Sequence, residues 1–531
     1  MKAMKVPVNM DILYVNPASL KSGLDPISES PPLNLMTIAA MVPEHGARLF
    51  DFKVEEYDEN RFSAELNQAD VVAITSLTPQ IHAALDVARL AKEQGCTTIV
   101  GGYHATLDPG FVMNDPSVDY AVRGEGEHTF HELIDYIDGK TQGTRLEDID
   151  GLSFRHNDGT IAHNKPRALE CDLDSFPLPR RDIIAGKEYR FMGARSDVIE
   201  TSRGCPHDCR FCCIVKMWHD PGQKIRYRTK SLHRIVQELE SLDKKKEFVF
   251  FADDNFTVNP NRVKTILEGI TASKRTHKMN YGAQSRVDVL HDNPWLVKLM
   301  RKAKFRQIFL GIESLHQQSL DAMNKKHTTP AKARHVVQML SSEGISVFGG
   351  MIIGFPGETR EMVYQNIQYA KSLQLSMIQF TPITAFPGTD FHEEMEARGM
   401  ITSTDYRDYD LFHAMMRTEQ LSTEDLNGLM KEAYAAYYLD GDYIKHEAKK
   451  FLNPFGKWGW LFKKLPGVIK QFLLGGATML KEQGIMRDVI SEELKGTTLP
   501  DFTDNQEKSE LDVDAMPREH RVAPPVFLEQ Q

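Results

Sequence analysis

Cysteine, tryptophan and basic charge are scarce in this sequence, and each scarcity excludes a class of protein. The 531 residues include six cysteines and four tryptophans, and 74 acidic residues outnumber 64 basic ones, for a net charge of −10. Six cysteines in so long a chain do not indicate a disulfide scaffold, so we expect reduced thiols. The acidic balance leaves no global basic footprint, so we expect no nucleic acid partner.

Long hydrophobic runs are also missing. No stretch reaches the roughly 18 apolar residues that span a bilayer, and the polar start from Met1 to Asn9 does not resemble a secretory signal. We therefore expect a cytoplasmic protein. Its length predicts two or three domains, and its hydrophobic content of 41% is sufficient for their cores.

The first part of the sequence alternates strand-like and helix-like segments. Its predicted strands are residues 11–15, 48–52, 71–77, 97–100 and 120–123. Helical spacing follows in residues 79–94 and 127–137. This alternation predicts a doubly wound, flavodoxin-like parallel sheet over residues 8–140. Ligands of such sheets sit at the carboxyl ends of the strands, which here carry Ser76, Gly101, Gly102, Tyr103, His104, Gly124 and Glu125.

A second alternating pattern begins near residue 191, after a polar, Asp-rich connector over residues 141–190. Its apolar runs lie at residues 198–200, 248–251, 280–283, 308–312, 347–353 and 377–380. Six repeats are too few for an eight-fold barrel, so we predict a partial (β/α)6 barrel over residues 191–400 and an α/β fold overall. A helical extension over residues 401–498 and a disordered tail over 499–531 are expected to follow.

Three cysteines carry the strongest chemical signal. Cys205, Cys209 and Cys212 follow a C-x3-C-x2-C pattern directly after the first predicted barrel strand. Thiolates suit iron–sulfur clusters, and this spacing lets one loop wrap one cubane. Three ligands leave one iron free to bind a small molecule. The alternative is a zinc site, for which His207 or Cys213 could supply the fourth ligand.

The cysteine loop and four later motifs resemble the radical S-adenosylmethionine (radical SAM) superfamily over residues 195–400. Arg203-Gly204-Cys205-Pro206 and Phe211 surround the loop, and FADDNF (251–256), GIES (311–314), GMIIGFPGE (350–358) and FPGT (386–389) follow in order. The resemblance implies a 4Fe–4S cluster, held by the three cysteines, that cleaves S-adenosylmethionine.

The residues expected to bind S-adenosylmethionine are strand-end side chains and two glycines. Asp253 and Asp254 offer hydrogen-bond acceptors near its amine, and Glu313 offers acceptors to its ribose. Gly350 and Gly354 let the backbone approach its adenine. A solvated strand end is the alternative interpretation of each acidic residue. The set comprises Phe211, Asp253, Asp254, Gln284, Arg286, Glu313, Gly350 and Gly354.

A flavodoxin-like sheet before a radical core is similar to the cobalamin-binding radical SAM subclass. Residues 101–104 and 123–127 resemble the loops that line the corrin there. No D-x-H-x-x-G motif is present, so the usual cobalt-ligating histidine has no obvious source. His104 is then either a cobalt ligand or part of the loop structure, and a domain that packs without cofactor stays open. Cys96 alone cannot support the second cluster of the methylthiotransferase branch.

The resemblance implies a cobalamin-dependent methyltransferase. A 5′-deoxyadenosyl radical would take hydrogen from an unactivated carbon, which would then receive methyl from methylcobalamin. The layout resembles the C-methyltransferases of green sulfur bacteria that modify bacteriochlorophyll(ide) at a C-8 or C-12 substituent. It also resembles the hopanoid methylases and the oxygen-independent magnesium-protoporphyrin monomethyl ester cyclase. A cobalamin-binding sensor with a degenerate core is the non-enzymatic alternative.

The expected partners follow from this interpretation. We expect a role in bacteriochlorophyll biosynthesis, a hydrophobic or planar small-molecule substrate and an electron donor such as ferredoxin or flavodoxin. Residues 451–481 combine aromatic and basic side chains. This composition favours a flat substrate or peripheral membrane contact, with a helix pair over the barrel mouth as the alternative.

Overall fold

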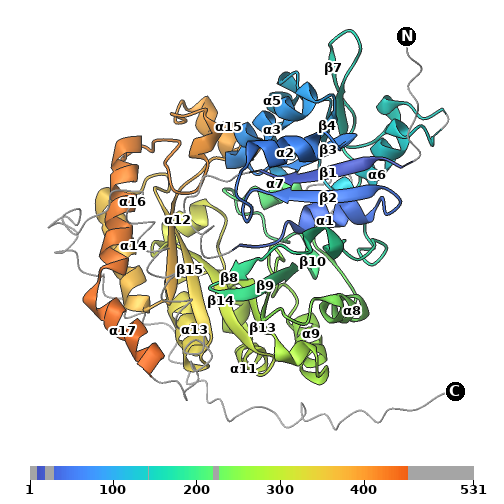
Figure 1. The fold of residues 1–531 in the computed structure, drawn as a ribbon. Coiled ribbons are helices and arrows are strands. Elements are labelled where there is room, and N and C mark those ends of the chain that lie inside the picture. The colour runs from blue at the N-terminus through green and yellow to red at the C-terminus, as the bar shows by residue number, and fades with distance from the viewer. Residues whose placement is uncertain (1–8, 18–28, 142, 219–225, 453–531) are drawn as a thin grey trace.

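The computed structural model describes residues 9–17, 29–141, 143–218 and 226–452, and they form two α/β units in contact (Figure 1). The first unit is built on a seven-stranded sheet in the order β2-β1-β3-β4-β5-β6-β7. Its strands are β1 (Asp11–Asn16), β2 (Gly46–Asp51), β3 (Val71–Thr75), β4 (Thr97–Gly101), β5 (Tyr120–Val122), β6 (Leu152–Arg155) and β7 (Ile161–His163).

The first five strands are parallel and have the predicted flavodoxin-like order. Their apolar residues are buried on both faces, as a parallel sheet covered by helices requires. One core lies under α1 (Leu33–Ala40) and α6 (Gly126–Ile137). The other lies under α2 (Glu59–Leu66), α3 (Ile81–Glu93) and α5 (Pro109–Asn114).

The segment predicted as a connector is more structured than its composition suggests. Strands β6 and β7 pair antiparallel and extend the first sheet beyond residue 140, and η3 (Arg181–Ile184) packs Ile183 and Ile184 into the first core. The expectation of a connector over residues 141–190 is wrong in this respect. A short hairpin needs only a few inward side chains, here Leu152 and Phe154, and so few apolar residues give a weak pattern.

The second unit confirms the partial barrel. Its sheet has the order β16-β15-β14-β13-β12-β9-β8, in which β8 (Arg190–Phe191) is antiparallel to β9 and the other six strands are parallel. These six are β9 (Ala194–Ile199), β12 (Phe248–Phe251), β13 (Asn280–Arg286), β14 (Phe305–Glu313), β15 (Ser346–Ile353) and β16 (Met377–Pro382).

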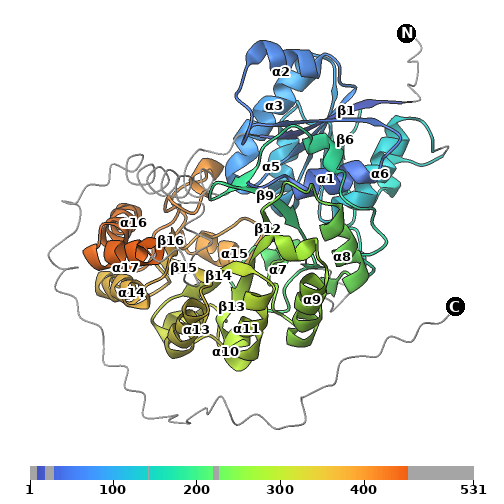
Figure 2. The same cartoon turned by 60° about the horizontal axis from the view of Figure 1, so that its bottom comes forward.

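Helices surround the outer side of this curved sheet in an arc (Figure 2). They pack their apolar stripes against one continuous core, which includes the stacked rings of Phe251, Phe256, Tyr281 and Phe305. The arc comprises α8 (Leu232–Ser241), α9 (Pro260–Ala272), α10 (Val287–Asp292), α11 (Trp295–Lys302), α13 (Pro330–Ser342) and α14 (Arg360–Leu373).

Two helices after the barrel cover the edge strand β16. Helix α16 (Thr423–Tyr438) begins in a capping box between Ser422 and Asp425, and its Tyr434 donates to the Phe380 carbonyl at 2.8 Å. Helix α17 (Gly441–Leu452) follows. The described part of the predicted extension over residues 401–498 is thus mainly helical from Thr423 to Leu452, and residues 401–422 are mostly irregular. Residues 453–531, including most of the aromatic–basic stretch and the whole predicted tail, lie outside the described residues.

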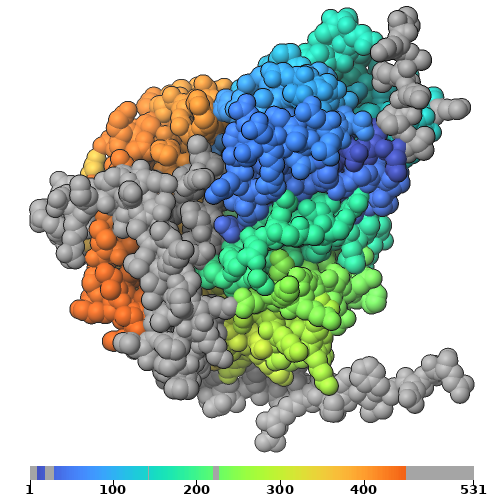
Figure 3. Space-filling view, in the orientation of Figure 1, coloured from blue at the N-terminus to red at the C-terminus, as the bar shows by residue number. Residues whose placement is uncertain are grey.

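The two sheets meet through their carboxyl edges. The N-terminal unit, shown in blue, packs on the start of the barrel, with the teal-green segment before the barrel between them (Figure 3). None of the helices in the described residues is long and apolar enough to cross a membrane.

Replacing Phe305 with alanine should destabilise the barrel. Its ring is fully buried, with its centroid 5.5 Å from those of Phe251, Phe256 and Tyr281. We expect a loss of ~3–5 kcal/mol in the free energy of unfolding, because the large cavity cannot collapse. Urea denaturation followed by circular dichroism measures this loss. Phe309→Ala, in the same strand but only half-buried, is the control, and an equal loss for both variants would contradict the expectation.

Candidate functional site

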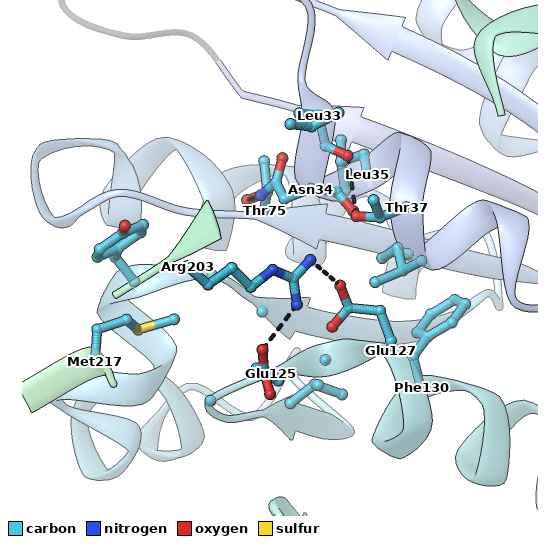
Figure 4. A pocket seen from close by; sticks show the side chains of 18 of the residues that line it. Leu33, Asn34, Leu35, Thr37, Thr75, Glu125, Glu127, Phe130, Arg203 and Met217 are labelled. Carbon is cyan, nitrogen blue, oxygen red and sulfur yellow. Dashed lines mark hydrogen bonds and ion pairs between the residues drawn. The ribbon is translucent and has the colours of Figure 1, made fainter. Parts of the chain in front are cut away.

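A cavity of about 270 Å³ lies where the two carboxyl edges meet (Figure 4). From the first unit it is lined by α1, by the ends of β3, β4 and β5, and by the start of α6. From the second unit it is lined by Glu200, Arg203, Met217, Trp218 and Ala252. Both units therefore contribute to one space, and most of its surface is apolar.

Five of the predicted residues of the first unit line this cavity: Gly101, Gly102, Tyr103, Gly124 and Glu125. Gly102 has φ +96°, and a Cβ there would lie 2.8 Å from the carbonyl oxygen of Ser76. Only glycine can make this turn, which opens the strand end to a ligand. Burial, together with the charges of Asp254 and Cys213, raises the pKa of Tyr103 well above its ordinary value. Tyr103 begins α4 (Tyr103–Leu107), which contacts α7 (Ile214–Met217), the helix directly after the cysteine loop.

Ser76 and His104 lie beside the cavity, outside its lining. Ser76 ties the end of β3 to the end of β4, because its amide and its hydroxyl both donate to the Gly101 carbonyl, at 2.9 and 3.2 Å. The His104 ring packs edge-on against Tyr406, with centroids 4.3 Å apart, and against Phe111. Neither of its nitrogens has a hydrogen-bond partner within the described residues, and burial lowers its pKa to about 4.

The three cysteines share a short loop that is largely enclosed. Burial raises the pKa of the Cys205 thiol, and the charge of Cys209 adds to this rise. Burial and the neighbouring thiols Cys213, Cys209 and Cys205 also raise the pKa of Cys212 well above its ordinary value. Arg286 partly offsets this repulsion, with its Nη1 3.8 Å from the Cys209 sulfur. The raised pKa values favour thiols in the empty loop, and the positive charge of a bound cluster would stabilise the thiolates instead.

No group of three or more His, Cys, Asp or Glu side chains in the described ranges is arranged to surround a single metal ion. A cubane is held differently, because each cysteine ligates a different iron. The C-x3-C-x2-C spacing suits that donor set, and the thiols are close enough for Cys209 and Cys205 to raise the pKa of Cys212.

Asp253 and Asp254 hold the start of the cysteine loop. Asp253 is fully buried and accepts hydrogen bonds from the amide and hydroxyl of Thr201, at 3.1 and 2.7 Å, and from the Ser202 hydroxyl. Asp254 accepts from the Gly204 amide at 2.9 Å and from the Trp218 indole at 2.7 Å. Burial raises the pKa of Asp254 to about 6.

The two predicted residues of β13, Gln284 and Arg286, have different surroundings. Arg286 is buried and forms a bidentate ion pair with Asp288, at 2.9 and 3.0 Å, which aims its remaining nitrogen at the cysteine loop. Gln284 is half-buried near the end of β13, and its backbone carbonyl accepts a hydrogen bond from the Phe256 amide at 3.0 Å.

Glu313 ends β14 in the left-handed region, with φ +68°, and pairs with Lys325. Both side chains are largely buried. Gly311 makes room for this pair, because a Cβ at that position would clash with both side chains. A non-glycine residue at this φ is strained, as residues at binding sites often are.

The glycine loop after β15 contacts the cysteine loop. Gly350 lies inside β15, where a Cβ would come within 2.9 Å of the Phe309 ring, and Gly354 has φ +88°. Buried Glu358 accepts from the Gly354 amide at 2.8 Å and fixes the turn. The ring of Phe355, next to Gly354, lies 6.3 Å from that of Phe211. Phe211 therefore joins the two loops.

Sequence reasoning missed several residues that line the cavity. Arg203 stood in a recognised motif, but nothing in the local sequence revealed its partners on α6. Asn34 and Thr37 lie on α1, a helix that the pattern did not indicate. Met217 and Trp218 follow the cysteines on the short helix α7 (Ile214–Met217) and its C-cap.

Comparison with known proteins identifies both units. The model of the radical SAM superfamily matches residues 199–370, and that of the B12 binding domain matches residues 27–134. An uncharacterized methyltransferase of Pyrococcus horikoshii is 32% identical over 418 residues, covering 77% of this chain and 88% of that protein.

Two further relatives have names that specify a substrate. The anaerobic magnesium-protoporphyrin IX monomethyl ester cyclase of Cereibacter sphaeroides is 27% identical over 480 residues, covering 88% of this chain and 75% of that protein. The bacteriochlorophyllide d C-12(1)-methyltransferase of Chlorobaculum tepidum is 27% identical over 457 residues, covering 84% and 91%.

A solved structure shares the fold. The cobalamin-dependent S-adenosylmethionine radical enzyme OxsB, with aqua-cobalamin and S-adenosylmethionine bound, has a TM-score of 0.64 and 18% identity, covering 92% of this chain and 83% of that protein. Together with the two matched domains and the relative from Pyrococcus, the fold and the shared cavity give one result. The chain belongs to the cobalamin-binding radical S-adenosylmethionine family, whose cofactors are a 4Fe–4S cluster, S-adenosylmethionine and cobalamin.

Proposed function

We propose that the protein is a radical C-methyltransferase that adds methyl to an unactivated carbon of a bacteriochlorophyllide-type tetrapyrrole, at a C-8 or C-12 substituent. The observation that carries the proposal is the shared cavity. Gly102 and Gly124 from the first unit, and Arg203 and Met217 from either side of the cysteine loop, line the same space. A methyl donor bound at one sheet and a radical formed at the other have to meet, and this cavity is where the two edges face each other.

The residues of the protein bind the cofactors, orient them and enclose the site of reaction. When bound, the cluster and S-adenosylmethionine supply an alkyl radical, and cobalamin supplies the methyl group. Cys205, Cys209 and Cys212 hold the cluster, while Asp253 fixes the backbone that leads into them. The apolar walls keep water away from a reactive centre.

The choice of substrate rests on the relatives. The cyclase of Cereibacter and the methyltransferase of Chlorobaculum both carry a tetrapyrrole in their names. The mainly apolar lining suits a flat, hydrophobic molecule. We extend the proposal to an electron donor of the ferredoxin or flavodoxin type, because reductive cleavage needs a low-potential electron. Peripheral membrane contact is a further proposal, for which residues 451–481 provide the composition.

Product analysis tests this function. The anaerobically reconstituted protein would be incubated with a reductant and S-adenosylmethionine in three arms, containing a bacteriochlorophyllide, a hopanoid or magnesium-protoporphyrin monomethyl ester. We expect mass spectrometry to detect a new methyl group on the bacteriochlorophyllide. One 5′-deoxyadenosine and one S-adenosylhomocysteine should form for each methyl.

Each other outcome has a defined meaning. Methylation of the hopanoid alone would overturn the substrate. Ring closure of the protoporphyrin ester without added methyl would overturn the methyltransferase in favour of a cyclase. Methylation without 5′-deoxyadenosine would overturn the radical route. No cleavage of S-adenosylmethionine in any arm would favour a cobalamin-binding sensor.

Alanine substitutions should separate the cluster ligands from their neighbour. Cys205→Ala, Cys209→Ala and Cys212→Ala should each lose the brown absorbance and reduce 5′-deoxyadenosine formation to background, since the cubane needs all three thiolates. Cys213→Ala is the matched control. It removes a partly buried thiol whose pKa burial raises to about 11, and it should keep the cluster. Iron and sulfide analysis measures the result, and a Cys213 variant without cluster would contradict the assignment.

A further inference from the structure

A single arginine connects the two units beside the cavity. Arg203 belongs to β10 (Ser202–Arg203), two residues before Cys205. Its Nη1 lies 2.8 Å from a carboxylate oxygen of Glu125, and its Nη2 lies 2.6 Å from Glu127 (Figure 4). Its Nε lies 2.9 Å from Glu200. Glu125 and Glu127 lie at the start of α6 in the first unit. All three nitrogens of the guanidinium are therefore used, two of them across the domain boundary.

The ion pairs of Arg203 with Glu125 and Glu127 are buried, so their geometry is tightly constrained. The side chains of Arg203, Glu125 and Glu127 are only 7%, 5% and 6% exposed. Burial alone would raise the pKa of the Glu127 carboxyl, but the charge and hydrogen bond of Arg203 hold it below its ordinary value. Charges removed from water are tolerated only when well paired, so a shift of one unit against the other is strongly opposed.

The partners of Arg203 are themselves fixed. Glu125 also pairs with Arg228 at 2.7 Å and accepts from the Glu170 amide at 2.9 Å. The Arg203 guanidinium lies 5.3 Å from the Phe176 ring and 6.0 Å from the Trp218 ring. The position of Arg203 is thus set by both units at once.

The backbone from Arg203 to Cys205 has little freedom. Gly204 has φ +86°, a Cβ there would clash with the Arg226 carbonyl, and its amide donates to Asp254 at 2.9 Å. Trp218, which lies near Arg203, donates to the same carboxylate at 2.7 Å. A displacement of Arg203 is therefore transmitted to the first cysteine.

We propose that Arg203 is a positioning residue. Its ion pairs with Glu125 and Glu127 lock the cysteine loop onto the first unit and so set the separation between the radical and the methyl donor. The pairs are needed for coupling the two chemical events and contribute less to cleavage of S-adenosylmethionine, which takes place within the second unit. The kinetic part of this inference rests on the proposed function.

Three substitutions test the positioning role. Arg203→Gln removes the guanidinium and with it all three ion pairs. Glu127→Gln removes the carboxylate of one ion pair on the first unit, with almost no change in side-chain shape. Arg48→Gln is the control. Arg48 is partly buried and forms an ion pair with Glu65 within the first unit, and neither residue lines the cavity or belongs to the cysteine loop.

Hydrogen–deuterium exchange of the protein without cofactors gives a readout that needs no turnover. We expect Arg203→Gln and Glu127→Gln to raise deuterium uptake at both residues 122–130 and residues 204–214, with the strands β14 to β16 unchanged. Arg48→Gln should leave both segments as in the wild type. Unchanged uptake in both test variants, or equal uptake in the control, would overturn the proposal.

The ratio of products gives the second readout. In the two test variants, methyl transfer should fall by about a hundredfold, since a small misplacement of reactants is costly. Formation of 5′-deoxyadenosine should fall far less, so the number of cleavage events per methyl rises. An unchanged ratio would overturn the positioning role. If the wild type transfers no methyl, the proposed function fails, while the exchange measurement still decides whether Arg203 locks the loop.

Discussion

A buried fork of ion pairs around Arg203 is the contact on which the arrangement of the two units depends. Each unit has a large apolar core, and the first core also includes Val198 of β9 from the barrel sheet. Apolar contact is not directional, whereas a desolvated guanidinium opposite two carboxylates is satisfied in one geometry. We infer that the fork contributes more to the relative placement of the units than to their stability, because the cost of desolvating buried charges offsets much of the energy of their pairing.

The charged contact continues along the interface as a line of alternating sign. Lys230 lies between Glu200 and Glu238, and Arg181 lies between Glu238 and Asp197. Arg181 comes from the segment between the units. Several charged side chains of that segment, such as Asp148, Asp172 and Glu188, are exposed, while Arg181 reaches into the interface between the two sheets.

The features that the sequence predicted are set by residues close together in the chain. Those that it could not predict are set by residues far apart in the chain. Strand β3 is a continuous apolar run, and the cysteines are close neighbours in sequence, so both follow from local pattern. The partners of Arg203 lie 76 and 78 residues away, and the surroundings of His104 are set by Tyr406, about three hundred residues later. Such contacts depend on tertiary packing, which no local pattern records. The hairpin of β6 and β7 was missed because it buries few side chains.

Residues after the barrel pack against the first unit. η5 (Tyr406–Asp408) packs against α3, Tyr406 donates to Asp108 at 2.6 Å, and Asp405 lies 3.3 Å from His82. The first unit precedes this segment in the chain, so during synthesis Asp108 and His82 lack these partners until the segment after the barrel has been made.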